Sequence, residues 1–435
     1  MFAGHDDEIR MLNRYFDGVD SQILVVYGAK GVGKTELLQE FTANKESVYY
    51  AARACSDREQ RYQWGCELRE AGYQLPEYPE YRDILEILLP EQTQKQILAL
   101  DEFQHLIKGG SHFFEELVQF LENRRMSRPV MTVLLSSAPG WVENSMVDCM
   151  GGLATYLTGF LKLKELSFPA IRELFPEYGM RDAICCYSVL GGIPGFWNNF
   201  DQNMSAKENI IHNIISKESR LYNEMAYYLA EELREPAVYN TILAAIAAGR
   251  GKLNDIYRHT GFSRAKISVY LKNLMELDLV EKIYAGVYRI TVPYVRFYFR
   301  FLFPFQSCLE RLSPEEFYEK KIAEALEAYI GESYGMICRQ MTEKELQAGN
   351  PAMEWIGKNY TLDLVTVDGD NQRMVASCIY DRELTGKDYK ELLKQAKRAK
   401  VRVDRAVLFG ERGFDKELLR LNKRGKVELR HLNEM

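Results

Sequence analysis

The chain has 435 residues, of which 46% are hydrophobic and 27% charged, as in a globular protein of roughly two to four domains. Its net charge of −6 argues against a protein that coats nucleic acid without regard to sequence. No apolar run approaches the roughly 18 residues that cross a bilayer, and the N-terminus lacks the pattern of a signal peptide. We therefore expect a cytoplasmic protein with no membrane partner.

The first part of the chain alternates apolar strands with helical patterns. Strands are expected at 22–27, 47–52, 96–100 and 130–136. Such alternation indicates an α/β domain built on a parallel sheet, which we place at residues 1–164.

A glycine-rich loop follows the first strand and leads into a helical segment. Its sequence, Gly28–Thr35, matches the phosphate-binding pattern G-x-x-x-x-G-K-[ST]. Lys34 would neutralise the β- and γ-phosphates, and Thr35 would bind Mg²⁺. A chance glycine turn is the alternative. No guanine-reading Asn-Lys-x-Asp motif follows, which favours ATP by default. The loop residues expected to contact the nucleotide are Gly28, Ala29, Lys30, Gly31, Val32, Gly33, Lys34 and Thr35.

Two further strands end in polar residues that suit hydrolysis. The strand at 96–100 leads into Asp101 and Glu102. Asp101 would reach Mg²⁺ through water, and Glu102 would polarise the attacking water, with Lys34 as its catalytic partner. A strand-end turn with solvated carboxylates is the alternative. The strand at 130–136 leads into Ser137, which could contact the γ-phosphate or the attacking water, or could simply belong to a strand-to-loop transition.

Helical segments follow from about residue 165. Between 236 and 304 the order helix, helix, helix, two short strands predicts a winged helix, with Ser263 capping the second helix of the helix-turn-helix. Arg264, Lys266 and Lys272 could meet DNA phosphates and base edges. We favour the alternative, packing against another domain or a protein partner, because the positive cluster is modest.

The last part, 305–435, predicts a second, smaller α/β unit. Strands are expected near 361–367, 373–380 and 404–410, with a helix at about 387–399. This region is basic from Lys387 to Arg430 and could approach nucleic acid. A solvated helix face is the interpretation we favour.

These motifs resemble the archaeal-type ATPase family, a branch of the AAA+-related signal-transduction ATPases with numerous domains (STAND). The resemblance runs along the whole chain. It rests on Phe2–Glu8, the phosphate loop, the run Asp101-Glu102-Phe103-Gln104, and Gly191–Pro194. It implies a P-loop NTPase sheet with ATP and Mg²⁺ as cofactors. It also implies a helical lid at 165–235, which would bring Pro194 near the nucleotide.

Two departures from the family pattern concern the rate of hydrolysis. His5 stands where the family has its first arginine, and Phe160 stands where an arginine often leads into the lid. Arg124 or Arg125 could supply the missing charge from another loop. Because an arginine finger accelerates hydrolysis strongly, its loss favours slow or partner-dependent turnover.

The family's C-terminal domain resembles restriction-endonuclease-like, PD-(D/E)xK nucleases. These hold Mg²⁺ with an aspartate on one strand and a Glu-x-Lys run on the next. Asp363 supplies the aspartate here, but Ser377 and Ile379 occupy the glutamate and lysine positions. The helical glutamate is also missing, with Tyr334-Gly335 in its place. We therefore expect a degenerate domain that does not cut nucleic acid.

The predicted function is a Mg-dependent, ATP-binding switch ATPase with slow hydrolysis, coupled to a winged helix and an inactive nuclease-like domain. The alternative is a DNA-binding regulator in which the nucleotide is mainly structural. Expected partners are ATP and ADP, and further candidates are DNA, a protein partner or a second copy of the chain.

Overall fold

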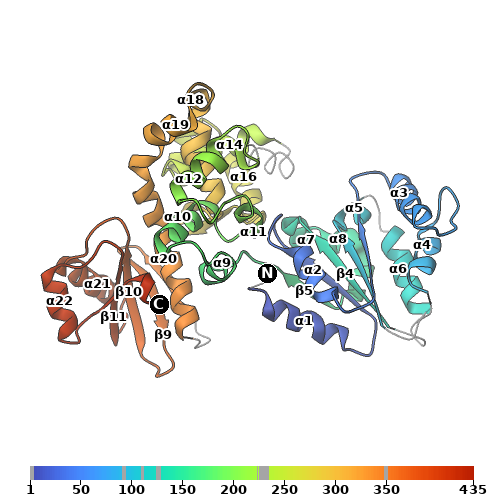
Figure 1. Ribbon diagram of the computed structural model, residues 1–435, viewed down its shortest axis with the longest axis horizontal. Coiled ribbons are helices and arrows are strands. Elements are labelled where there is room, and N and C mark those ends of the chain that lie inside the picture. Colours follow the sequence, from blue (N-terminus) through green and yellow to red (C-terminus); the bar gives the residue numbers. More distant parts are fainter. Residues whose placement is uncertain are drawn as a thin grey trace. The chain divides into compact units, whose positions relative to one another are not determined.

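The structure is a computed structural model that describes residues 4–90, 95–108, 112–123, 129–222, 224, 235–346 and 351–435. The chain divides into two compact units, Met1–Glu165 and Leu166–Met435, whose elements are drawn in Figure 1. The predicted boundaries at residues 235 and 304 lie within the second unit and stay predictions. No helix in the described ranges is long and apolar enough to cross a membrane.

A parallel sheet forms the centre of the first unit. In the part of the chain that the structure describes, it has five strands in the order β2-β3-β4-β1-β5. The strands are β1 (Gln22–Tyr27), β2 (Ser47–Ala51), β3 (Gln96–Asp101), β4 (Val130–Ser136) and β5 (Gly159–Lys162). The first four strands confirm the prediction. The fifth strand was not predicted, because four residues with one buried side chain make no recognisable strand pattern.

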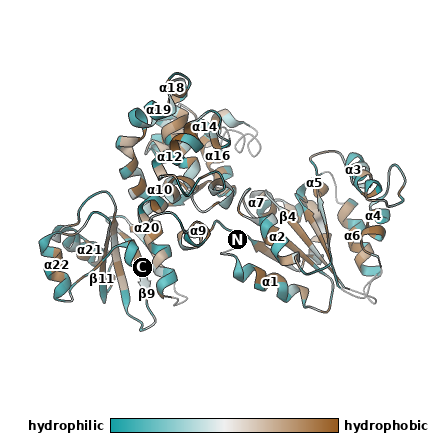
Figure 2. Cartoon of the chain, viewed as in Figure 1, coloured by the Kyte–Doolittle hydropathy of each residue, from teal (hydrophilic) through white to brown (hydrophobic). Residues whose placement is uncertain are grey.

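Helices flank this sheet and bury its strands. Every residue of β3 and β4 is buried, as expected for strands covered on both faces, and Figure 2 colours the strands largely hydrophobic. Trp64, Tyr81 and Phe113 come from three different helices and pack into one core cluster. The helices are α1 (Asp6–Phe16), α2 (Lys34–Thr42), α3 (Asp57–Glu70), α4 (Tyr81–Leu88), α5 (Gln104–Ile107), α6 (His112–Asn123), α7 (Pro139–Asn144), α8 (Met146–Met150) and η1 (Gly151–Tyr156).

The strand order decides which loops meet. Because all pairings are parallel, the carboxyl ends of the strands share one edge of the sheet. Strand β4 lies between β1 and β3. The residues that follow these three strands, Gly28, Glu102 and Ser137, therefore come together at this edge.

The second unit begins with helices. The Leu166 N–H donates to the Gly192 carbonyl at 2.8 Å, which ties the start of the unit to the Gly191–Pro194 run. The first elements are α9 (Phe168–Leu174), α10 (Met180–Leu190), α11 (Pro194–Trp197), α12 (Ala206–Ile210) and the π-helix η2 (Ile211–Ile215).

The segment predicted as a winged helix has the expected element order. Helices α14 (Pro236–Ala247), α15 (Leu253–Thr260) and α16 (Arg264–Glu276) precede the antiparallel strands β6 (Val280–Ile283) and β7 (Val287–Ile290). Ser263 caps α16 as predicted, because its hydroxyl accepts the Lys266 N–H at 3.2 Å. The winged-helix assignment itself stays a prediction.

A short helical region then leads to the long helix α20, which contacts α9, α10 and two strands of the C-terminal sheet, β9 (Tyr360–Val367) and β10 (Arg373–Ile379). The short helix η3 (Tyr284–Gly286) connects the two strands of the preceding hairpin. The helices that follow the hairpin are α17 (Pro293–Phe297), η4 (Tyr298–Leu302), η5 (Phe303–Phe305), α18 (Gln306–Arg311), α19 (Pro314–Lys321) and α20 (Ala323–Leu346).

A mixed sheet closes the chain. Within the described residues it has five strands in the order β12-β11-β10-β9-β8. Strands β8 to β10 are antiparallel, and β10 to β12 are parallel. The predicted strands and helix of this region are confirmed as β9, β10, β11 and α21. Its elements are β8 (Met353–Gly357), β9 (Tyr360–Val367), β10 (Arg373–Ile379), α21 (Gly386–Arg398), β11 (Arg405–Gly410), α22 (Lys416–Lys423), β12 (Glu428–Arg430) and η6 (Leu432–Glu434).

Candidate functional site

The phosphate loop joins β1 directly to α2. The Gly28 N–H donates to the Ser136 carbonyl at 3.2 Å, which anchors the start of the loop to the end of β4. Gly31 and Gly33 have φ angles of 83° and 103°, a region that side chains with a Cβ rarely enter. Gly33 immediately precedes α2. The loop therefore ends at a helix N-terminus, whose N–H groups and dipole favour phosphate.

Lys34 is buried within its own loop. Its Nζ donates to the carbonyl oxygens of Gly28 and Ala29, each at 3.0 Å. Both acceptors are neutral, whereas phosphate oxygens carry charge and form stronger hydrogen bonds with an ammonium group. The lysine thus lies where an incoming phosphate would compete for it.

Asp101 ends β3 and is held at three points. Its Oδ2 accepts the Thr35 hydroxyl at 3.3 Å and the Tyr49 hydroxyl at 2.9 Å. Its Oδ1 accepts the backbone N–H of Glu102 at 2.9 Å. Hydroxyl and carboxylate oxygens are the ligands that Mg²⁺ prefers, so Thr35 and Asp101 fit a magnesium ion shared with nucleotide phosphates.

Each carboxylate oxygen of Glu102 accepts a hydrogen bond from a neighbouring side chain. The Ser137 hydroxyl donates to Oε1, and the Gln104 side-chain amide donates to Oε2. Burial raises the pKa of Glu102, but these hydrogen bonds and the charge of Lys34 outweigh it, and the pKa is lowered. The carboxylate is therefore ionised at neutral pH. Its backbone adopts a φ of 50°, in the left-handed region, as strained residues at functional sites often do.

Tyr49 and Gln104 were not predicted as site residues. Tyr49 lies on β2, and its contact with Asp101 depends on the pairing of β2 with β3. Burial and the Asp101 carboxylate raise the pKa of the Tyr49 hydroxyl, which therefore remains a protonated donor at neutral pH. Gln104 belongs to the Asp101–Gln104 run of the family resemblance, and this run is the sequence signal that could have indicated Gln104 as a site residue.

The two departures from the family pattern occupy different surroundings. His5 is buried, and a Cβ built on Gly33 would lie 3.8 Å from its Nε2, so this side chain lies beside the phosphate loop. Phe160 lies on β5 and is exposed. Arg124 and Arg125 lie outside the described residues, as do Phe2 and Ala3 of the N-terminal run.

Comparison with known families matches two parts of the chain. Residues 2–197 match a family described as an ATPase domain predominantly from Archaea. The N-terminal part of the chain belongs to this ATPase family. Residues 298–392 match a family of archaeal and bacterial proteins of unknown function. An uncharacterized protein of Methanocaldococcus jannaschii is 22% identical over 423 residues, which cover 91% of this chain and 90% of that relative.

Three solved structures are similar to the chain. A Walker-type ATPase of Pyrococcus abyssi is 18% identical with a TM-score of 0.49, covering 68% of this chain and 95% of that one. The ORC2 protein of Aeropyrum pernix, with ADPNP and ADP, is 13% identical with a TM-score of 0.43, covering 75% and 93%. A STAND protein of Pyrococcus horikoshii is 15% identical with a TM-score of 0.29, covering 79% and 50%. All three TM-scores lie below 0.5, too low for an inference about function.

The residues predicted to face DNA lie on α16 of the second unit. Arg264 donates to the Asn254 side chain at 3.1 Å and stacks over Tyr257, 4.3 Å from the ring centroid. Lys266 lies over Phe262 at 5.1 Å, and Lys272 lies 3.6 Å from Glu276. Arg264 thus contacts α15, Lys266 contacts the segment before its helix, and Lys272 contacts its own helix. These contacts neither require nor prevent DNA binding.

Two of the positions compared with nuclease ligands in the sequence, Asp363 and Ser377, lie in hydrogen-bond contact. Asp363 on β9 accepts the Ser377 hydroxyl at 3.1 Å and the Cys378 N–H at 2.8 Å through one oxygen. Burial raises the pKa of Asp363. Across the described ranges, no three His, Cys, Asp or Glu side chains gather as a metal-binding group. A serine hydroxyl thus lies beside the Asp363 carboxylate, and the nuclease-like assignment of this domain stays a prediction.

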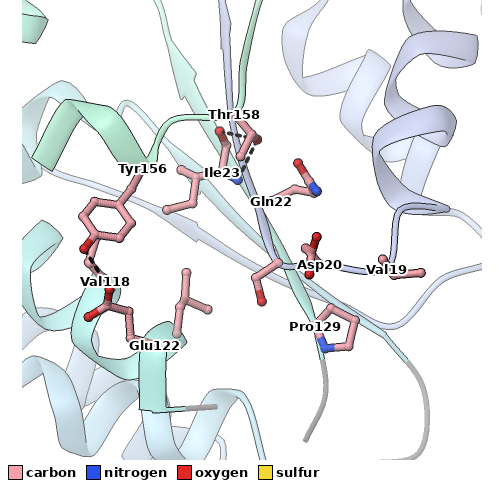
Figure 3. A pocket seen from close by; sticks show the side chains of 11 residues that line it. Val19, Asp20, Gln22, Ile23, Val118, Glu122, Pro129, Tyr156 and Thr158 are labelled. Carbon is pink, nitrogen blue, oxygen red and sulfur yellow. Dashed lines mark hydrogen bonds between the residues drawn. The ribbon is translucent and has the colours of Figure 1, made fainter. Parts of the chain in front are cut away.

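A pocket of about 420 Å³ lies at the other edge of the first sheet (Figure 3). It is lined by the amino end of β1 at Gln22 and Ile23, whereas the phosphate loop follows the carboxyl end of the same strand. Tyr156 donates to Glu122 at 2.7 Å at its wall, and the Thr158 hydroxyl donates to the Ile23 carbonyl at 3.0 Å. This pocket is therefore separate from the site around the loop.

Proposed function

We propose that this chain binds ATP with Mg²⁺ and hydrolyses it slowly, as a switch ATPase whose turnover depends on a partner. The observation that carries the proposal is the contact between Thr35 and Asp101, 3.3 Å apart at the carboxyl edge of the sheet. It joins the two sequence motifs into one site with a phosphate loop on one side and an ionised Glu102 on the other.

Each predicted residue receives a role in this site. Gly28–Thr35 would hold the phosphates through backbone N–H groups, and Lys34 would neutralise them. Thr35 and Asp101 would hold Mg²⁺, which when bound neutralises charge developing on the transferred phosphate. Glu102 would orient the attacking water. Pro194, in the second unit, is proposed to contact the nucleotide as part of the lid at 165–235.

Ser137 and Gln104 each donate to one oxygen of Glu102 and orient the carboxylate, which has further lone pairs to accept a hydrogen bond from water. Slow turnover is instead supported by the residue at position 160. Phe160 cannot supply the positive charge that stabilises the transition state. A partner or a second copy of the chain could supply that charge.

The test is the Glu102→Gln variant, which keeps the size of the side chain but removes its charge and replaces one acceptor oxygen with an NH2 donor. We expect ATP affinity within roughly threefold of wild type and phosphate release lowered at least about 100-fold, the usual worth of a positioned acid–base group. Glu86→Gln, which changes an exposed carboxylate of the same unit, should leave both quantities unchanged. Equal turnover by the Glu102→Gln variant would overturn the role given to Glu102.

The second candidate function is a DNA-binding regulator in which the nucleotide is mainly structural. It is favoured by the exposed basic residues Arg264 and Lys272 on α16, the second helix of the predicted helix-turn-helix. Fluorescence anisotropy with duplex DNA tests it. The double change Arg264→Ala and Lys272→Ala should abolish binding and spare ATP hydrolysis. Lys390→Ala with Lys394→Ala, on α21, tests the basic C-terminal region in the same assay.

We further propose that the second unit contains the lid, a winged helix at 236–304 and an inactive PD-(D/E)xK-like domain at 305–435. The inactive assignment is supported by the Asp363–Ser377 contact, which replaces a carboxylate pair. Incubation with plasmid or oligonucleotide DNA and Mg²⁺ or Mn²⁺ should give no cleavage. Metal-dependent cleavage by the purified chain would overturn this assignment.

A further inference from the structure

Tyr49 reaches the proposed magnesium site from a strand that carries none of the motifs. It lies in β2, at one end of the strand order of the first sheet. Tyr49 as a residue is 50% exposed, whereas Asp101, which it contacts, is 8% exposed. The Tyr49 hydroxyl donates to Asp101 Oδ2 at 2.9 Å. An exposed side chain thus places its polar end on a buried acidic group.

The hydrogen-bond donors to Asp101 differ in whether they are themselves proposed ligands of the metal. Thr35 donates to Oδ2, but its own oxygen is a proposed magnesium ligand. The Glu102 N–H donates to Oδ1 as part of the backbone. Tyr49 is the side chain that contacts Asp101 without a proposed place among the ligands. It therefore has the position of an outer partner that orients a ligand.

The neighbouring residue in the same strand, Tyr50, has a structural role and serves as a comparison. Tyr50 is buried and stacks on Trp64, with ring centroids 3.9 Å apart. Tyr49 points to the opposite face and makes its polar contact at the site. Removing the Tyr49 hydroxyl alone would leave the ring and the strand in place.

We propose that Tyr49 is a positioning residue of the magnesium site, acting by holding the Asp101 carboxylate in the orientation that the ion requires. This proposal rests on the function proposed above. Hydrogen-bond partners of metal-ligating carboxylates typically change metal affinity by about 10–100-fold when they are removed. The predicted effect is therefore on metal affinity first and on hydrolysis only through it.

The experiment compares wild type with Tyr49→Phe in the full chain, using ADP and Mn²⁺ as probes. Electron paramagnetic resonance of free Mn²⁺ gives the affinity of the protein–ADP complex for the metal. We expect an affinity about tenfold weaker in Tyr49→Phe, at the lower end of the range for such partners. ADP affinity in the presence of a chelator should not change. Tyr73→Phe, which alters a tyrosine of similar exposure at 48%, should match wild type in both measurements.

Three outcomes would overturn the proposal. Mn²⁺ affinity within twofold of wild type would show that Tyr49 does not act on the metal. An equal loss of ADP affinity without metal would show a structural role. A wild-type chain that binds neither ADP nor Mn²⁺–ADP would overturn the proposed function itself, and this result would be seen before any variant is made.

Discussion

The Ser137 hydroxyl donates a hydrogen bond to Oε1 of Glu102, linking the end of β4 to the end of β3. The two residues are 35 positions apart in sequence, and the pairing of Leu100 with Leu134 brings their strands to the same level. Ser137 therefore contacts the carboxylate that would orient water, and its predicted contact with the γ-phosphate stays a prediction.

Replacing Ser137 with alanine should affect turnover more than binding. The change removes one of two donors to Glu102, so the carboxylate loses part of its orientation. Because a hydrogen bond to a charged group is worth about 1.5–3 kcal/mol, we expect kcat to fall roughly tenfold or more. The Kd for ATP should change little. Steady-state kinetics with Ser145→Ala, an exposed serine of the same unit, as control would check this. An unchanged kcat would show that the contact has no part in hydrolysis.

Lys34→Ala should weaken nucleotide binding. The ammonium group would exchange two neutral carbonyl acceptors for charged phosphate oxygens, so its loss removes a net favourable interaction. We expect the Kd for ATP to rise at least about tenfold, or about 1.4 kcal/mol. Equilibrium dialysis or calorimetry measures this. Lys30→Ala removes an exposed charge from the same loop and should change Kd by much less. Equal losses would indicate a general charge effect.

Contiguous motifs made much of this site predictable. Gly28–Thr35 and Asp101-Glu102 are local patterns, and the apolar runs before them are confirmed as β1 and β3. That they meet at one edge follows from parallel pairing, which alternating strands and helices already indicate.

The contacts made by Tyr49 and Gln104 could not be predicted in the same way. In the sequence, Tyr49 has the pattern of an exposed residue in an alternating strand. The residues around it do not indicate that its hydroxyl contacts the Asp101 carboxylate, 52 positions away. Gln104 follows the acidic pair, and its amide donates to Glu102 across a turn in which Glu102 has a left-handed backbone. Such contacts depend on strand register and turn geometry, which composition and periodicity leave open.

Gly28→Ala tests how closely the phosphate loop is packed against the backbone of Leu163 in the same chain. A Cβ at this position would lie 2.3 Å from the Leu163 carbonyl oxygen, and Leu163 is itself held by a 2.7 Å hydrogen bond to Tyr27. Backbone must therefore move, at a cost of about 1–3 kcal/mol as for other overpacked sites. We expect a lower melting temperature and weaker ATP binding. Gly152→Ala, where a Cβ meets open space, should leave both unchanged. Equal melting temperatures for the two variants would contradict the packing argument.

Arg405→Met tests an ion-pair cluster in the C-terminal sheet. Arg405 lies 2.8 Å from Asp368 and forms a two-bond contact with Glu428, at 2.8 and 2.9 Å. These hydrogen bonds lower the pKa of Asp368 below its ordinary 3.8 and the pKa of Glu428 below its ordinary 4.5.

Because both pKa values are depressed in the folded chain, these carboxylates add stability above the ordinary values, and that stability is lost as the pH falls through the lowered ones. The Arg405→Met variant should therefore be less stable than wild type at pH 7, and the difference should shrink as the carboxylates become protonated. Hydrogen exchange in peptides covering β11 and β12, measured across this pH range, would show it. Arg420→Met, an exposed arginine on α22, provides the control. A stability difference that stays constant with pH would mean that Arg405 acts through packing of its side chain and not through its charge.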